Sequence, residues 1–499
     1  MNCKIINPVV ALLLFPLSGM ADVPDNGPDV ESLSSKENIR QDIIYPAGSA
    51  RLKPVTGMAD KYLASRLPAE WRYEEGLKQT LPAEDLWWKQ FDDAALNELI
   101  QLAEKNNFNL KSAYTRIETA KANLQQVRSA WYPTIGLTAG YTRTRSSGET
   151  GPEYSRAYTD DYIGLGLDVS WEIDVFGRVY ARSKAGEADV AASEADYVAA
   201  QIALSANVAK AYITLRLAQT QLAIAEEHIG NQEKIVDMTR ARMECGLGNK
   251  LEVTQSRETY LSTKASIPTL KSDVAVAKNS LAVLCGTYPE EIEKYCTSDV
   301  PLPILLAQPA VGVPADLLRR RPDILAAEQQ LAVAAANVGV SKKEFLPTLS
   351  LTARGFTQSH KPGNLFKSNS LGYMIAPQLS WTVFEGFARK AAVAEAKAAM
   401  EQAVDDYNQT VLNAVQEVNT AIARLEGARD AIGIQLELLE AGKESLTLAV
   451  DLYKRGLTQF SNVTDAQINV LEQENTLAAY KANTLQAAIT LYEAIGGGY

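Results

Sequence analysis

The sequence predicts a mixed α and β protein, mainly α, built from two internal repeats that each hold two short strands and long helices. The repeats appear at a spacing of 210 residues, from "GLGNKLEVTQSR" at Gly246 to "GLTQFSNVTDAQ" at Gly456, which share Gly-Leu and Val-Thr. Two stretches, 179–244 and 389–455, contain almost no glycine or proline and are rich in helix-forming residues. Helices of that length are typical of coiled coils or of the walls of elongated assemblies.

Both repeats are expected to follow the order helix, strand, strand, long helix, turn and last helix. The strands and turns are short segments between helical stretches, and each has a counterpart in the other repeat. The expected boundaries are strands at about 133–147 and 161–175 and a turn near 246 in repeat 1 (87–286), strands at about 347–358 and 372–384 and a turn near 456 in repeat 2 (314–499), and a linker at 287–313.

The strands alternate strictly between apolar residues and small or polar ones. In "YIGLGLDVSWEIDV", residues 162–175, the series that starts at Ile163 is apolar, whereas the series that starts at Gly164 is glycine or polar. Such alternation fits a half-buried sheet in a soluble protein, and it also fits a membrane barrel with an apolar outer surface and a polar interior. Four strands do not close a membrane barrel, and lipid does not tolerate open edges. The membrane alternative therefore requires several chains to pool their strands.

The first 21 residues have the features of an export signal. Lys4 supplies positive charge, residues 9–17 form an apolar core, and Gly19 and Ala21 are the small residues that precede a cleavage site. A buried N-terminal strand is the alternative. The next segment, 22–86, is rich in proline, serine and charge, so its composition assigns it no fold.

Composition and charge exclude several classes of function. The net charge is −11 and no basic run stands out, so nucleic acid is not expected as a partner. The chain has two histidines, His228 and His360, which lie far apart in sequence. A histidine-based triad or a histidine-rich metal site is therefore not expected, and the sequence predicts neither an enzyme nor a cofactor.

Three cysteines follow the export signal. Cys285 and Cys296 bracket the short loop "CGTYPEEIEKYC" and could form a disulfide in an exported protein, which would leave Cys245 single. Three free thiols are the alternative. The spacing of these cysteines is not that of a metal site.

Several motifs resemble those of one family. "LLRRRPDILAAEQQLAVAAANVGVSKKEFLPTLSL", residues 317–351, resembles a signature of TolC-type outer-membrane efflux channels, and it is most similar to the NodT-like branch that serves resistance-nodulation-division pumps. "WWKQFDDAALNELI", "EIDVFGR" and "LYEAIGGGY" resemble further parts of the same family. The residues of this chain that match the signature are Arg321, Pro322, Asp323, Pro133 and Pro347.

This resemblance implies a homotrimer in the bacterial outer membrane, in contact with outer-membrane lipid. Four strands from each chain would form one twelve-stranded β-barrel, which continues into a long α-helical barrel across the periplasm. Residues 22–86 and 287–313 would wrap the middle of the helical barrel. The implied function is a passive exit channel for drugs or other small toxic compounds. The implied partners are a periplasmic adaptor (membrane fusion) protein and an inner-membrane pump of the resistance-nodulation-division type.

The two Gly-Leu turns would lie at the periplasmic tips, where family members meet the adaptor. The alternative is a purely structural role, in which glycine ends one helix and the Val-Thr pair starts the next. The matching residues are Gly246, Leu247, Val253 and Thr254 in repeat 1 and Gly456, Leu457, Val463 and Thr464 in repeat 2.

Residues around the second turn match the gate of TolC-like channels. Asp465 matches an acidic residue that forms a ring at the closed tip in three copies, and Tyr453 matches a tyrosine that tethers the closed state. A ring of carboxylates attracts cations and bars anions, whereas an exposed helix-capping aspartate is the alternative. Two positions depart from the pattern, because Thr458 stands in place of a basic partner and Asn462 in place of a second aspartate. The gate is therefore expected to rest on hydrogen bonds and one acidic ring.

The N-terminus departs from the lipoprotein members of the branch. Met20 stands where those members have a lipid-bearing cysteine, so no lipid anchor is expected. Two other functions stay open at this point, namely the outer-membrane duct of a type I protein secretion system and a periplasmic coiled-coil scaffold. The alternating strands that contain Trp171 and Trp381 argue against the scaffold.

Overall fold

The computed structural model of the chain describes residues 86–149, 157–297, 301–305, 314, 318 and 320–497. All of them belong to one compact unit that starts at residue 56. The expected export signal at residues 1–21, Met20, nearly all of the segment 22–86 and part of the linker 287–313 lie outside the described residues.

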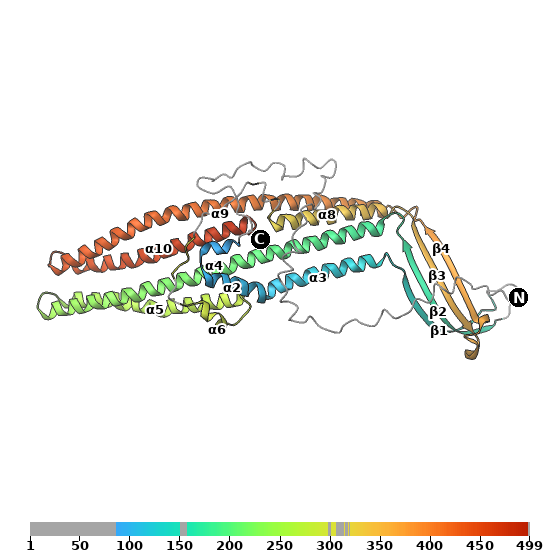
Figure 1. Cartoon of the computed structure of the whole chain (residues 1–499), viewed down its shortest axis with the longest axis horizontal. Helices are drawn as coiled ribbons and strands as arrows, with labels where there is room; N and C mark the ends of the chain where they lie inside the picture. The colour runs from blue at the N-terminus through green and yellow to red at the C-terminus, as the bar shows by residue number, and fades with distance from the viewer. Residues whose placement is uncertain are drawn as a thin grey trace, which may run out of the picture. The chain divides into compact units, whose positions relative to one another are not determined.

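Two helical hairpins of matching dimensions dominate this unit (Figure 1). The first consists of α4 (Arg178–Glu244) and α5 (Lys250–Leu284), and the second of α9 (Ala388–Lys454) and α10 (Phe460–Ala494). The long helices contain 67 residues each and the shorter ones 35 each. The other helical elements that lie wholly within the described residues are η4 (Trp87–Phe91), α2 (Ala94–Asn106), α3 (Phe108–Ser129), α6 (Pro289–Ile292), η5 (Glu293–Tyr295), α8 (Pro322–Lys343), η6 (Pro362–Asn364) and η7 (Ser368–Ser370).

Four strands form one antiparallel sheet at the end of the helices opposite the hairpin turns (Figure 1). They are β1 (Thr134–Arg145), β2 (Thr159–Ile173), β3 (Thr348–Ser359) and β4 (Leu371–Ser380), and they lie in the order β1-β2-β3-β4. Among the described residues, β1 and β4 therefore each have one edge without a neighbouring strand.

The predicted last strand, 372–384, extends too far. β4 ends at Ser380, which pairs with Thr348, the first residue of β3. Residues 381–384 have no strand beside them, and a strand persists only where its backbone groups are paired. The Trp381 Nε1–H instead donates to the carbonyl of Phe345 at 3.0 Å. The same hydrogen bond occurs in the first half of the chain, where Trp171 Nε1–H donates to the Trp131 carbonyl at 3.1 Å.

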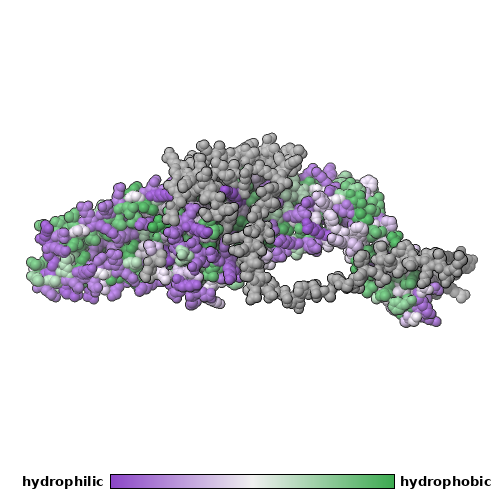
Figure 2. All heavy atoms as spheres, in the orientation of Figure 1, coloured by the Kyte–Doolittle hydropathy of each residue, from purple (hydrophilic) through white to green (hydrophobic). Residues whose placement is uncertain are grey.

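The strand register sorts the side chains of the sheet onto two faces. One row across the sheet contains Leu137, Leu167, Gly355 and Tyr373, and both Leu137 and Tyr373 are exposed. The next row, which points to the opposite face, contains Gly136, Asp168, Arg354 and Met374. Figure 2 shows hydrophobic atoms over the strands and over the helix ends that join them. The sheet thus presents an exposed apolar face and a face of glycine and polar residues.

The main apolar core lies where α2, α4, α5, α9 and α10 meet. The Trp87 ring stacks on Tyr492 with centroids 5.5 Å apart, and the Tyr212 hydroxyl donates to buried Asp93 at 2.7 Å. By length and composition α4 could cross a membrane, but half of its apolar window is buried inside the protein, as in a core helix. This core joins the two ends of the described chain and both hairpins.

Candidate functional site

Each helical hairpin turns through a Gly-Leu pair with the same backbone geometry. We call residues 242–257 the first tip and residues 452–467 the second tip. The leucine N–H donates to a carbonyl of the preceding helix, at 2.8 Å in the first tip and 2.9 Å in the second. The glycines have φ values of 73° and 74°, which glycine adopts without strain. Both tips therefore end their long helix in a Schellman motif.

The predicted adaptor-docking residues divide into exposed and buried ones. Leu247 and Leu457 project from the turns and are 68% and 69% exposed. Val463 is fully buried, so its side chain packs inside the second tip and is not on the surface of this chain. Of the other predicted docking residues, Gly246, Gly456 and Thr254 are exposed, whereas Val253 and Thr464 are half-buried.

A cluster of three side chains joins the two tips. The Tyr453 hydroxyl, on α9, donates to Glu252 Oε2, on α5, at 2.7 Å. The guanidinium carbon of Arg242, on α4, lies 4.8 Å from the centroid of the Tyr453 ring, and Arg242 Nη1 donates to the Lys454 carbonyl at 2.9 Å. We call Arg242, Glu252 and Tyr453 the tip link. It connects residues that lie about 200 positions apart in sequence.

The tyrosine of the tip link is also held by apolar packing. Tyr453, Phe460 and Val463 are buried together, and the two aromatic rings meet edge to face with centroids 5.1 Å apart. Burial, followed by the hydrogen bond to the Glu252 carboxylate, raises the pKa of Tyr453 to about 12. At neutral pH the hydroxyl is therefore protonated and donates to the carboxylate.

The other predicted gate residues also belong to the second tip, where Asn462 and Asp465 are exposed and Thr458 is half-buried. Asp465 is exposed on the first turns of α10, and it does not cap that helix, which begins at Phe460. Asn462 Nδ2 donates to Thr458 Oγ1 at 2.6 Å. The two positions that depart from the TolC pattern therefore bond to each other and not to Tyr453.

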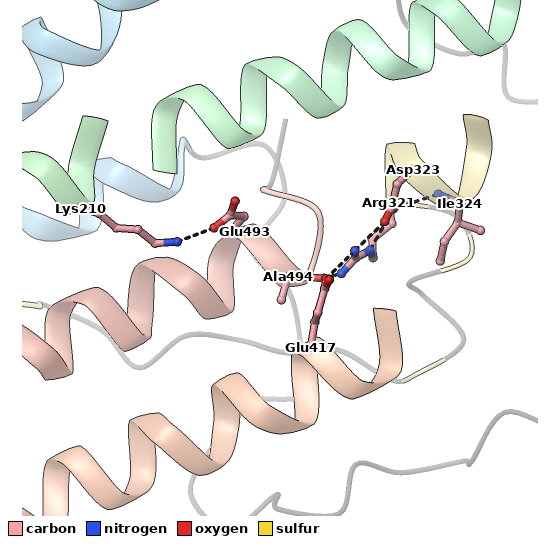
Figure 3. Close-up of polar contacts among 7 residues, drawn as sticks. All are labelled: Lys210, Arg321, Asp323, Ile324, Glu417, Glu493 and Ala494. Carbon is pink, nitrogen blue, oxygen red and sulfur yellow. Dashed lines mark hydrogen bonds and ion pairs between the residues drawn. The ribbon is translucent and has the colours of Figure 1, made fainter. Parts of the chain in front are cut away.

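The signature arginine forms a clamp near the start of α8 (Figure 3). Arg321 is 8% exposed, and its Nη2 lies 2.6 Å from Asp323 Oδ2 and 2.7 Å from Glu417 Oε2, while Nη1 donates to the Ala494 carbonyl at 2.8 Å. Burial alone would lower the pKa of Arg321, but the hydrogen bonds and charges of the two carboxylates outweigh it and hold the pKa above its ordinary value. A cavity of about 420 Å³ opens beside this clamp. The signature thus fastens the beginning of α8 to α9 and to the end of α10.

The signature prolines have a local role. Pro133 and Pro347 stand one residue before β1 and β3, where each chain segment leaves a helix and enters a strand. Proline lacks the N–H that a continuing helix needs, and it disfavours helical geometry in the residue before it. Pro322 is the first residue of α8, where its missing N–H leaves no helical hydrogen bond unmade.

The described residues contain no group of three metal-binding side chains. His228 Nε2 lies 2.8 Å from Glu474 Oε2, and this hydrogen bond links α4 to α10. Of the two alternatives for the cysteines, the structure has the free thiols. Cys285 and Cys296 are both buried, and burial raises the pKa of Cys285 to about 12.

Sequence reasoning missed Arg242 and Glu252. The residues 210 positions later are Leu452 and Asn462, so the two tips differ in charge at both positions. A charged residue in one repeat, with an uncharged residue at the matching position of the other repeat, was therefore a signal that could have identified Arg242 and Glu252. The sequence does not reveal that α4 places Arg242 against the ring of Tyr453.

An exposed apolar sheet with open edges, joined to long helical hairpins, is the architecture of an outer-membrane channel with a large periplasmic helical portion, and the relatives of this chain are such channels. More specifically, the chain belongs to the outer membrane efflux protein family, whose model matches residues 99–287 and 313–497.

Known relatives agree with this assignment over most of the chain. The toluene efflux pump outer membrane protein TtgC of Pseudomonas putida is 29% identical over 455 residues, which cover 91% of this chain and 93% of that protein. The cation efflux system protein CusC of Escherichia coli is 29% identical over 419 residues, or 83% of this chain and 88% of that protein. The solved outer-membrane channel OprN has 28% identity and a TM-score of 0.80, with 86% of this chain and 97% of that chain covered.

Proposed function

We propose that this channel is the passive outer-membrane exit duct of a tripartite efflux pump. It works as a homotrimer with a periplasmic adaptor protein and an inner-membrane pump of the resistance-nodulation-division type, and it catalyses no reaction and needs no cofactor. The sheet carries this proposal. Its exposed apolar face suits lipid, and its two open edges call for pairing with strands of other copies. Three copies would pool twelve strands into one barrel.

The equal helix lengths support two internal repeats that contribute alike to a helical barrel below the strands. At about 1.5 Å per residue, helices of this length reach roughly 100 Å, which suits a duct across the periplasm. In this arrangement the polar face of the sheet lines the lumen. The sheet has its glycine and small polar residues on that face.

The tips would act as gate and docking surface. The tip link holds the second hairpin against the first, so loss of its contacts would free the second tip to move. Three copies of Asp465 would form an acidic ring that favours cations. The protruding side chains of Leu247 and Leu457 would meet the adaptor, and buried Val463 would shape that surface from within.

Relatives give a range of cargo for the proposed duct. Relatives are named as components of efflux systems for toluene, for antibiotics and for cations. Low-molecular-weight toxic compounds are therefore the proposed cargo of this chain. A type I secretion duct is the second candidate, because the same architecture would also pass an unfolded protein.

Membrane fractionation and bilayer recording test the proposal together. We expect a heat-modifiable trimer in the outer-membrane fraction and ion conductance after insertion into planar bilayers. A protein that salt washing releases would contradict the channel and favour a scaffold. Deletion of the gene should raise susceptibility to small toxic compounds, whereas loss of a secreted protein with unchanged susceptibility would favour the secretion duct.

A further inference from the structure

The polar face of the sheet carries an aromatic ring beside an ion pair. The register places Phe356 opposite Gly166 on β2 and Gly372 on β4, and it places Arg354 opposite Asp168. The guanidinium carbon of Arg354 lies 5.5 Å from the centroid of the Phe356 ring. Arg354 Nε lies 3.1 Å from Asp168 Oδ1. An apolar ring and a charge pair therefore adjoin each other on this face, with Met374 beside Arg354 in the same row.

Glycines of the neighbouring strands lie beneath these side chains. A Cβ at Gly372 would lie 2.5 Å from Cζ of Phe356, and a Cβ at Gly166 would lie 3.3 Å from Nε of Arg354. Both distances are shorter than ordinary carbon contacts, so the Phe356 ring lies over Gly372 and the Arg354 guanidinium lies over Gly166. Phe356 is half-buried, and the Arg354 side chain is 40% exposed. Part of each group is thus accessible.

The first half of the chain lacks this arrangement. At the spacing of 214 residues that aligns "YPTIGLTAGY" with "LPTLSLTARG", the positions that match Arg354 and Phe356 are Gly140 and Thr142. The ring and the charge are therefore not a requirement of the strand pairing that both halves share. They are additions to the second half alone.

We propose that Phe356, Arg354 and Asp168 form a weak contact site for aromatic carboxylates on the wall of the duct. This rests on the proposed function, in which the polar face lines the lumen. An aromatic ring would stack, offset, on the accessible side of Phe356, and its carboxylate would accept hydrogen bonds from the Nη groups of Arg354. Asp168 offsets part of the charge of Arg354, so contact is weak enough for the solute to leave, as conduction requires.

Saturation-transfer NMR on the purified, detergent-solubilised protein tests the site. The probes are benzoate and cyclohexanecarboxylate, which differ in the aromatic ring but share the carboxylate. We expect Phe356→Leu, which keeps an apolar side chain but removes the ring, to reduce the benzoate signal about 2- to 10-fold and to leave the cyclohexanecarboxylate signal unchanged. Arg354→Gln should reduce both signals. Tyr373→Leu, on the apolar face of the sheet, is the matched control and should change neither.

A benzoate signal that is equal in the wild type and Phe356→Leu would overturn the site. Planar-bilayer conductance of the same preparations separates this outcome from failure of the channel itself. A protein that conducts but fails the benzoate test contradicts the contact site alone, whereas a folded trimer without conductance contradicts the duct.

Gly372, which lies beneath the Phe356 ring, gives a second test. Gly372→Ala would push the Phe356 ring off the wall, so it should weaken the benzoate signal and lower conductance. Gly355→Ala, where an added Cβ meets no atom within 4 Å, should do neither. Equal effects of the two substitutions would overturn the close packing of the ring over Gly372.

Discussion

The first and second tips share a backbone and differ in side-chain chemistry. Both turn through Gly-Leu with a left-handed glycine and an exposed leucine. In the first tip Asn249 caps α5 by accepting from the Glu252 N–H at 3.1 Å, whereas Gln459 at the matching position caps nothing with its side chain. In the second tip buried Phe460 takes the place of exposed Lys250. One turn geometry thus supports a polar tip and an apolar one.

This difference shows how a duplicated element can divide its tasks. The first tip contributes Arg242 and Glu252, which are the charged members of the tip link. The second tip contributes the ring of Tyr453 and the packing behind it. Neither tip could form the link with a second copy of itself. The first tip has Met243 in place of the tyrosine, and the second has Leu452 and Asn462 in place of the charged pair.

The largest expected effect comes from removing the apolar centre of the second tip. Phe460→Ala should destabilise that tip by about 3 kcal/mol, because it deletes a buried ring. Lys250→Ala, at the matching position of the first tip, should change stability by less than about 0.5 kcal/mol. Hydrogen exchange of the tip amides measures both. Similar losses in the two variants would contradict the division between an apolar and a polar tip.

The second expected effect concerns the acidic ring. Asp465→Ala should raise conductance and reduce cation preference in planar bilayers, because it removes the carboxylates of the proposed acidic ring. Gln255→Asp, which places a carboxylate at the matching position of the first tip, should leave both unchanged if the second tip alone lines the opening. A shift in selectivity from Gln255→Asp would show that both tips face the ions.

A smaller effect is expected from the tip link. Tyr453→Phe should cost about 1 kcal/mol through the lost hydrogen bond to Glu252, and Arg242→Gln a similar amount through the lost contact with the ring. The double variant should lose less than the sum, since the two changes break one cluster. Met243→Leu, at the position that matches Tyr453, is the control. Strict additivity in hydrogen exchange of the tips would argue against coupling.

The smallest effect is a dependence on alkaline pH. The folded-state pKa of Tyr453 is raised to about 12, above its ordinary value of 10. Its contribution to stability is therefore complete below about pH 10 and is lost as pH rises toward 12. The stability difference between the wild type and Tyr453→Phe should shrink over that window in denaturant titrations. A stability difference that stays constant from pH 8 to 11 would show that the Tyr453 hydroxyl does not contribute to the tip link.

Much of the architecture follows from local patterns in the sequence. Strict alternation predicts the strands, and the scarcity of glycine and proline predicts α4 and α9. The Gly-Leu pairs predict the tips because only glycine adopts the left-handed residue of that turn at no cost. The end of β4 was missed because it depends on where β3 begins, which alternation within residues 372–384 cannot reveal.

The candidate site was less predictable. The exposure of Leu247 is a local property, since it follows from the turn, but the burial of Val463 depends on Tyr453 and Phe460. The tip link depends on the relative placement of α4 and α9, and nothing in either helix alone encodes it. The resemblance directed attention to Thr458, whereas the basic group that contacts the Tyr453 ring is Arg242, from the other hairpin.

The stacking of Trp87 on Tyr492 has a consequence for how the chain acquires its structure. These residues begin and end the described fold, and Arg321 further ties the end of α10 to the start of α8. The central core cannot close until the final helix has been synthesised and has left the secretion machinery. Pairing of such distant residues is slow because the intervening chain must first be ordered. The central core is therefore expected to remain unfolded and accessible to chaperones throughout export. A truncation before Tyr492 should leave this core unfolded.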